Sequence, residues 1–216
     1  MKVLVFDTET TGLPKERNPS IYNTKQWPHI IQLSYILYDT NKDKMLVEHD
    51  WIIKIPIDTE MSKETINIHG ISMEDSQRDG IDIMDALECF DICLNAADVV
   101  VGHNLQFDKK MIIIENIRNS RQSGFKNKKK AEFCTMINGV DICNIYKRST
   151  VNPREKYLKY PTQSELHKKL FNQIPSGVHN SWIDILVCLR CYCMMTIKKD
   201  LFETNKSFRA KYRACI

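Results

Sequence analysis

The sequence predicts an α/β domain in which helices flank a mixed sheet. Three segments near the N-terminus, residues 2–6, 30–38 and 45–55, have the apolar or alternating patterns that are typical of β-strands. Further along the chain, helical spacing alternates with short apolar segments, which indicates strands joined by helices. With 216 residues and a hydrophobic fraction of 43%, residues 1–216 should form a single domain with a substantial core.

The three early strands have short connections and should form an antiparallel meander. A helix follows in which apolar residues recur at helical spacing from Ile83 to Leu94, and Asp82 precedes it as the expected cap. The next predicted elements are a strand at 98–102, a helix from about 105 to 118, and a strand at 132–136.

The C-terminal part predicts two more helices. Thr162 and Glu165 have capping-box spacing, so a helix should begin there and extend to about residue 171. Residues 180–197 predict a long apolar final helix, in which Cys188, Cys191 and Cys193 are expected to pack in the core rather than bind a metal. Loop-like composition predicts irregular structure at 120–130 and 147–161.

Composition restricts the function only weakly. The net charge of +4 and the pI of about 8.5 are compatible with a polyanionic partner but do not require one. The N-terminus does not resemble a secretion signal, and no apolar stretch is long enough to cross a bilayer. We therefore expect a soluble intracellular protein, with no membrane contact and with its eight cysteines reduced.

Two acids follow the first predicted strand directly. Asp7 and Glu9 are two residues apart, so on a strand they project to the same side. Adjacent carboxylates repel each other unless a cation lies between them, and oxygen ligands favour hard ions such as Mg²⁺ or Mn²⁺. The alternative for such a pair is solvated surface charge, but its position at the end of an apolar strand favours a metal site.

Two further segments contain acids that are ambiguous when each is considered alone. Asn104 should cap the helix that begins near residue 105, and Asp108 then lies in its first turn, where it could simply complement the helix dipole. His179 should lie on the loop before the final helix, with Asp184 on the helix itself. A partly exposed histidine there could accept a proton from water, or could be an ordinary surface residue.

Taken together, these segments resemble the DEDDh branch of the DnaQ-like 3′–5′ exonucleases, which includes the proofreading epsilon subunit of DNA polymerase III. The motifs are Phe-Asp-Thr-Glu-Thr-Thr-Gly-Leu at 6–13, Gly-His-Asn-x-x-Phe-Asp at 102–108, and His-Asn-Ser-x-x-Asp at 179–184, with a shorter element at 68–71. The resemblance extends from Val3 to about Tyr192. It departs from the family at Ser181, where alanine is common.

The resemblance implies a ribonuclease-H-like fold, with a mixed five-stranded sheet and flanking helices. It also implies hydrolysis assisted by two Mg²⁺ or Mn²⁺ ions per active site. Asp7 would contact both ions, Glu9 and Asp184 would complete one site, and Asp108 would serve the other, partly through water. His179 would remove a proton from the attacking water.

The same resemblance assigns residues to the substrate. Leu13 would pack against the terminal base, although filling the edge of the core is the alternative for this residue. The other expected substrate contacts are the backbone amides of Thr8 and Thr10, together with Ile68, His69, His103, Asn104 and Phe107.

The implied activity is removal of nucleoside 5′-monophosphates from 3′ ends, with single-stranded or frayed DNA favoured over RNA. An enzyme that trims RNA 3′ ends remains the alternative, because the motifs do not distinguish the sugars. A DNA polymerase is a possible partner. Because no long tail follows Tyr192, a free-standing exonuclease is favoured over a tethered or non-enzymatic polymerase module.

Two basic stretches fall in the predicted loops. The run made of Lys126, Lys128, Lys129 and Lys130 is expected to be a solvated loop. The stretch that contains Arg148, Arg154, Lys156 and Lys159 is the better candidate for a surface that guides a nucleic-acid strand.

Overall fold

The computed structural model describes residues 1–127, 130–152 and 154–215, so Lys128 and Lys129 of the basic run lie outside the described residues. Its main sheet has five strands in the order β3-β2-β1-β4-β5. β1 pairs antiparallel with β2 and parallel with β4, β2 pairs antiparallel with β3, and β4 pairs parallel with β5. The predicted mixed sheet and its N-terminal meander are therefore confirmed. The strands are β1 (Lys2–Thr10), β2 (Ile30–Asp39), β3 (Lys44–Ile52), β4 (Val99–Gly102), β5 (Ala131–Cys134), β6 (Tyr146–Arg148) and β7 (Lys156–Leu158).

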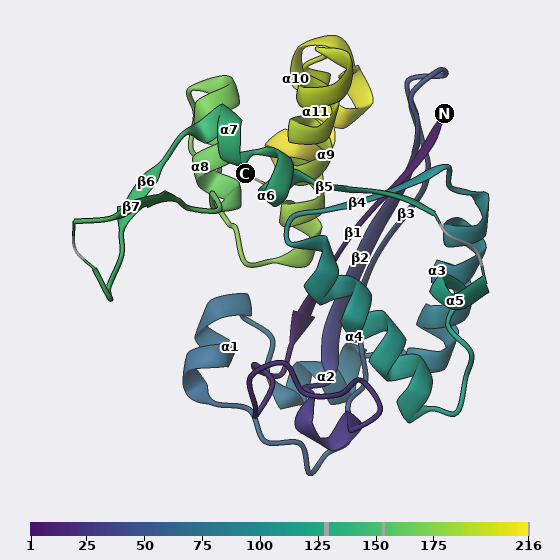
Figure 1. Cartoon of the computed structure of the whole chain (residues 1–216). Coiled ribbons are helices and arrows are strands. Elements are labelled where there is room, and N and C mark those ends of the chain that lie inside the picture. Colours follow the sequence, from purple (N-terminus) through teal and green to yellow (C-terminus); the bar gives the residue numbers. More distant parts are fainter. Residues whose placement is uncertain (128–129, 153, 216) are drawn as a thin grey trace.

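Helices cover both faces of this sheet (Figure 1). The longer ones are α3, α4 and α9, and the sequence predicted all three, α3 from the helical spacing of its apolar residues and α9 from its length and apolar character. The helical elements are η1 (Thr24–Gln26), α1 (Lys63–His69), α2 (Met73–Asp79), α3 (Ile83–Ala96), α4 (Leu105–Arg118), α5 (Gly124–Asn127), α6 (Thr135–Asn138), α7 (Val140–Cys143), α8 (Gln163–Phe171), α9 (Ser181–Ile197), α10 (Leu201–Thr204) and α11 (Lys206–Cys215). No helix in the described ranges combines the length and the apolar character that crossing a membrane requires.

Alternation along β1 divides the core into two layers. Leu4 and Phe6 pack with α3 and α4 on one face, whereas Val3 and Val5 pack with α9 on the other. The same alternation, continued past Phe6, points Asp7 toward the α9 face. The strand that forms the centre of the sheet thus also fixes the direction of the first predicted site residue.

Several boundaries and loops differ from the sequence predictions. β3 ends at Ile52, and Ile53 forms an isolated bridge to Ile81 while its amide still donates to the Ile31 carbonyl on β2. The predicted loop at 120–130 includes the one-turn helix α5, and the predicted loop at 147–161 contains β7 and part of β6. The short helices α1 and α2 were not anticipated, although Ser62 and Ser72 cap them with their side chains.

The caps were predicted with mixed success. Asp82 accepts a hydrogen bond from the Met84 amide, and Thr162 forms the expected capping box with Glu165. The prediction for Asn104 was wrong, because its side chain makes no capping bond. Its φ of 69° places it in the left-handed region, where the chain turns sharply from β4 into α4.

A buried polar network fastens the C-terminal helices to α9. Arg190, only 3% exposed, donates from Nε and one terminal nitrogen to both carboxylate oxygens of Asp200, each at 2.8 Å. Its guanidinium also lies 3.9 Å from the centre of the Phe171 ring. His167 Nε2 accepts a hydrogen bond of 2.7 Å from the Tyr212 hydroxyl, and His167 Nδ1 donates to the Gln173 carbonyl at 2.7 Å.

The cysteines of α9 are core residues, as predicted. Cys188 is 3% exposed, and Cys191 and Cys193 are fully buried among apolar side chains. The seven cysteines whose side chains are described are free thiols.

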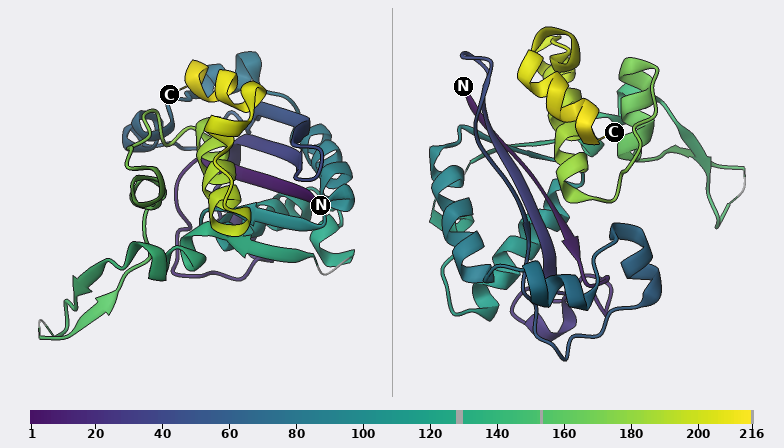
Figure 2. Two further views of the ribbon diagram at one scale, coloured as in Figure 1. Left: turned by 90° about the horizontal axis from the view of Figure 1, so that it is seen from above. Right: turned by 180° about the vertical axis from the view of Figure 1, so that it is seen from behind.

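Outside the main body, β6 and β7 form a two-stranded antiparallel hairpin. It projects from the molecule as an arm between α7 and α8 (Figure 2).

Candidate active site

The site begins at the C-terminal end of β1. Asp7 and Glu9 lie two residues apart on that strand, and Asp184 lies in the first turn of α9, which packs on the same face. Each of these three residues offers a carboxylate oxygen, and the three oxygens lie within 4.8 Å of one another. Three oxygen donors at this separation suit a hard divalent cation.

Asp108 reaches the same place from the opposite side of β1. It lies in the first turn of α4 and is 3% exposed. Its Oδ1 accepts hydrogen bonds from the hydroxyl of Thr8 at 2.8 Å and from the Thr8 amide at 3.2 Å. Thr8 stands between Asp7 and Glu9 in the chain, so these bonds hold Asp108 beside the other three acids.

The third motif is folded around Asp184. One of its carboxylate oxygens accepts the His179 amide at 3.0 Å, while Asn180 caps α9 by accepting the amides of Trp182 and Ile183. His179 itself precedes the helix, as predicted, and has a φ of 74°. The left-handed turn at His179 thus joins its main chain directly to the cluster.

Ser181, the position that departs from the family, fits without disturbing the cluster. It is fully buried, and its hydroxyl forms a hydrogen bond with Ser34 on β2. Its amide donates to Gln32 Oε1 at 3.2 Å, and both Gln32 and Ser34 donate to Asp50. A serine therefore suits this position because β2 supplies polar partners for it.

All four acids have raised pKa values, with burial as the main cause. Burial, followed by repulsion from Asp108, Asp184 and Glu9, raises the pKa of Asp7 well above its ordinary value. Burial and the neighbouring acids raise the pKa of Glu9 to about 8. Burial is also the main cause that raises the pKa of Asp108 to about 7 and that of Asp184 to about 6. A cation bound among these four acids would compensate the charge that makes them hold protons more tightly than usual.

A cavity of about 450 Å³ opens beside Glu9. Two of its apolar side chains are exposed to an unusual degree, Leu13 at 81% and Ile68 at 51%. Leu13 follows Gly12, which lies just beyond β1 and has a φ of 151°, a conformation that side chains rarely adopt. The lining residues are Thr8, Glu9, Thr10, Gly12, Leu13, Glu64, Thr65, Ile68, His69 and Phe107.

One ring nitrogen of His69 makes no hydrogen bond within the described part of the chain. Its Nδ1 accepts the Ile71 amide at 3.1 Å, so Nε2 carries the proton of the neutral ring. Nε2 is buried without a partner among the described residues. His69 is one of the residues that line the cavity, and a buried donor without a partner is uncommon in proteins.

The other residues predicted to bind substrate are placed differently. His103 is engaged within the protein, since Nε2 donates to the Pro161 carbonyl at 3.1 Å and Nδ1 bonds to the Thr135 hydroxyl at 3.0 Å. Burial lowers the pKa of His103 to about 4, so the ring is neutral. The Thr8 amide is likewise bonded to Asp108, and neither His103 nor Asn104 lines the cavity.

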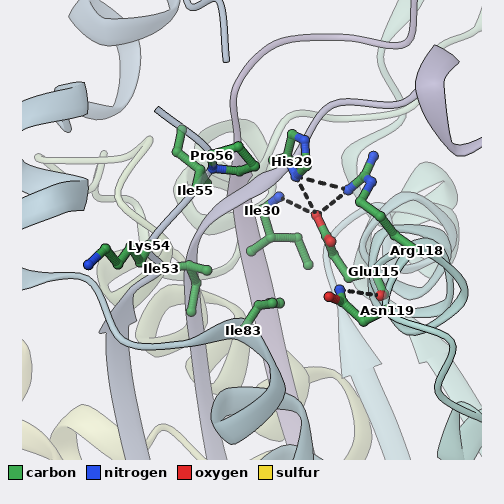
Figure 3. A pocket seen from close by; sticks show the side chains of 10 residues that line it. All are labelled: His29, Ile30, Ile53, Lys54, Ile55, Pro56, Ile83, Glu115, Arg118 and Asn119. Atoms are coloured by element: carbon green, nitrogen blue, oxygen red, sulfur yellow. Dashed lines mark hydrogen bonds and ion pairs between the residues drawn. The ribbon is translucent and has the colours of Figure 1, made fainter. Parts of the chain in front are cut away.

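A second cavity, of about 420 Å³, lies away from the acids (Figure 3). Glu115, 2% exposed, accepts the Ile30 amide at 3.1 Å and pairs with Arg118. Arg118 in turn donates to the carbonyl oxygens of Thr24, Trp27 and Pro28. These groups have partners within the protein and fasten the segment before β2 to α4, so we interpret them as structural.

Three contributors to the site were not predicted from the sequence. Gln163 donates to the main-chain carbonyl of Asp184 at 2.6 Å, and Glu64 and Thr65 line the cavity from α1. The serine cap at Ser62 is a sequence signal for α1, whereas nothing in the sequence distinguishes Gln163 from an exposed helical residue.

The fold and the acidic cluster define the class of protein. Residues 4–192 match the exonuclease family designated RNase_T, and the chain belongs to that family. The family is an exonuclease family of the DEDD superfamily, and the four acids of the cluster all lie within the matched residues. No curated protein matches the sequence.

Among solved structures, the chain is similar to exonuclease I of E. coli. The complex of that enzyme with a dT13 oligonucleotide has a TM-score of 0.65 at 12% identity, covering 94% of this chain and 42% of that one. A zinc-bound complex with single-stranded DNA gives 0.59 at 13% identity, covering 97% and 42%. A product-bound form gives 0.63 at 12% identity, covering 98% and 46%. These likenesses show the shared fold, and the chain spans less than half the length of the exonuclease I chains.

Proposed function

We propose that this protein is a 3′–5′ exonuclease of the DEDDh branch that removes nucleoside 5′-monophosphates from single-stranded or frayed DNA. The observation that carries the proposal is the convergence of four acids from β1, α4 and α9. Three of them offer oxygens within 4.8 Å of one another, and the fourth is bonded to the residue between the first two. His179 is linked to the cluster through its amide.

The donor set fits two Mg²⁺ or Mn²⁺ ions. Asp7, Glu9 and Asp184 would hold one ion, and Asp7 and Asp108 would hold the other. Such ions stabilise the charge that develops on the phosphoryl and leaving oxygens, and they lower the pKa of bound water. All four donors are carboxylates, and the raised pKa values of the four acids fit the displacement of their protons by cations.

The chain's own groups would divide the remaining work. The His179 imidazole, on the loop before α9, would accept the proton from the attacking water. Leu13 and Ile68 would pack against the terminal base, with Phe107 at the cavity wall and the Thr10 amide at the terminal sugar or phosphate. His69 Nε2 would donate a hydrogen bond to an oxygen of the terminal nucleotide.

The assignment of DNA rests on the likeness to exonuclease I, which is described in complexes with DNA oligonucleotides. Wild-type protein with magnesium would be incubated with matched 5′-labelled DNA and RNA strands, and with mismatched duplex DNA. Shortening one nucleotide at a time from the 3′ end, faster for single-stranded DNA than for RNA, is expected. Faster shortening of the RNA would replace the DNA assignment with RNA trimming.

The matched variants are Asp7→Ala and Asp58→Ala, an acid in the exposed loop before α1. Asp7→Ala should abolish shortening while the protein stays folded, and Asp58→Ala should leave it unchanged. Full activity of Asp7→Ala, or of wild-type protein in excess chelator, would refute the metal assignment.

A DNA polymerase is a possible partner for such an enzyme, although we favour a free-standing exonuclease. Size-exclusion chromatography with a polymerase from the same source would reveal an association as a shift in elution.

A further inference from the structure

The β6–β7 hairpin has an unusual charge pattern. Residues 145–160 contain five basic side chains and one acidic side chain. In the ladder, Arg148 lies directly opposite Lys156, and Tyr146 lies opposite Leu158. Since side chains alternate along a strand, these four side chains share one face of the ribbon, and that face contains no acid.

This arrangement is unfavourable for the hairpin in isolation. Like charges directly opposite each other destabilise an antiparallel pair, and a lone two-stranded hairpin is at best marginally stable in water. Arg148 and Lys156 form no ion pair with any residue in the described ranges. An anion lying along the face would remove the repulsion between them.

Aromatic side chains accompany the charges. Tyr146 is 56% exposed and Tyr160 is 60% exposed, and Tyr157 projects from the opposite face at 51%. Exposed aromatic rings beside basic groups are the combination that binds single-stranded nucleic acid, because bases stack on the rings while cations contact phosphates.

The base of the hairpin is fixed to the elements that carry the acids. The Lys159 amide donates to the Ile145 carbonyl at 3.0 Å and closes the base, and Lys159 Nζ pairs with Glu165 on α8. Two residues further along, the Pro161 carbonyl accepts from His103, in the segment that leads to Asp108.

The hairpin also extends to the same side of the molecule as α1, which lines the cavity beside Glu9. Three views agree on this placement (Figures 1 and 2). A strand whose 3′ end lies at the acids could therefore continue toward the arm.

From these observations, we infer that the acid-free face of the hairpin binds the single strand upstream of the nucleotide being removed. Arg148 and Lys156 contact its phosphates, and Tyr146 stacks on a base. This inference rests on the proposed exonuclease function and adds a second contact region to it.

The test separates binding along the strand from chemistry at its end. Binding would be measured by fluorescence anisotropy, in an Asp7→Asn background that prevents cleavage. The probe is a labelled oligothymidylate of about 20 nucleotides, longer than the roughly 4–16 that single-strand-binding folds cover. The variant is Arg148→Gln/Lys156→Gln, and the matched control is Lys42→Gln/Lys206→Gln, which neutralises two exposed lysines elsewhere.

The hairpin variant should bind at least tenfold more weakly than the control. Its slope of log affinity against log salt should be shallower by about 1.4, since each neutralised phosphate on a single strand contributes about 0.7. Tyr146→Ala should weaken binding without changing the slope. With Asp7 restored, the hairpin variant should cleave a dinucleotide, too short to reach the arm, at the control's rate.

Equal affinities and slopes for the hairpin variant and the control would overturn the inference. A loss of dinucleotide cleavage as large as the loss of oligothymidylate binding would also overturn it, since the hairpin would then support the active site itself. If the wild-type protein cleaved neither the oligothymidylate nor the dinucleotide, that result would instead refute the proposed function. Circular dichroism would verify that each variant folds, and Tyr146→Ala provides an independent test if the double variant does not.

Discussion

The substitution Asp108→Asn is expected to stabilise the metal-free protein near neutral pH while it abolishes cleavage. Asp108 is 3% exposed, and a single oxygen of its side chain accepts both hydrogen bonds from Thr8. An asparagine has nearly the same shape and offers one carbonyl oxygen that can accept the same two bonds. The substitution therefore removes the negative charge and preserves the contacts.

The magnitude follows from the pKa of Asp108. Burial and repulsion from Asp184 raise it from 3.8 to about 7, although bonds from Thr8 oppose the shift. The folded protein thus keeps a proton that the unfolded chain releases, so the stability linked to this group is complete below about pH 4 and is lost as the pH rises through about 7. About three pH units at roughly 1.4 kcal/mol each give a ceiling of about 4 kcal/mol.

Relaxation of the site and entry of water should reduce this ceiling to on the order of 1–2 kcal/mol. For a protein of this size, that corresponds to a Tm higher by about 2–8 °C in the variant at about pH 8. About pH 5 lies roughly a third of the way from the unfolded-state pKa of Asp108 to its folded-state pKa. The Tm difference between the variant and the wild-type protein should therefore shrink there to about a third of its value at about pH 8.

Thermal unfolding followed by circular dichroism would measure these differences in excess chelator at both pH values. Asp58→Asn, in an exposed loop, is the control and should leave Tm unchanged. In magnesium the order of stability should reverse, because only the wild-type protein keeps the full set of ligands and gains the binding free energy. An Asp108→Asn variant that is less stable than wild type in chelator at about pH 8 would refute the view that the buried charge of Asp108 destabilises the metal-free protein.

Three further predictions concern His179, the cavity residue Leu13 and the buried Arg190. His179→Ala should lower kcat by about 10²–10⁴ while DNA binding in chelator stays unchanged, and an equal loss of both would indicate that His179 holds the substrate. Leu13→Ala should raise KM for single-stranded DNA without changing Tm, because the side chain is 81% exposed; a fall in Tm would instead show that it packs in the core. Arg190→Met should destabilise the protein by about 3–5 kcal/mol in chemical denaturation, because it leaves Asp200 without its buried partner, whereas Arg78→Met, at an exposed ion pair, should leave the stability nearly unchanged.

The acids could be predicted because their positions depend on strong local rules. Alternation on β1 places Asp7 and Glu9 on one side, and the apolar pattern of the last long helix locates Asp184 in its first turn. The closeness of the three segments does not follow from such rules, since it depends on long-range pairing of β1 with β4 and on packing of α9. The family resemblance supplied that part of the prediction.

The remaining features depend on contacts that the sequence does not display. Asn104 matches the composition of a helix cap, but the turn from β4 into α4 requires a left-handed residue there, and its side chain caps nothing. His103 belongs to a motif, yet its ring is bonded to Thr135 and Pro161, both distant in sequence. The hairpin lacks a tight-turn dipeptide and an apolar face, so neither usual signal for strands was present.

The network around Arg190 also links α11 to the segment that precedes α9. His167 receives the Tyr212 hydroxyl on one side of its ring and, with the other, holds the Gln173 carbonyl on the path toward His179. A single imidazole therefore joins α11 to the segment between α8 and α9, which also contains His179. Turnover should be sensitive to the packing of a helix that lies beyond residue 192, where the family match ends.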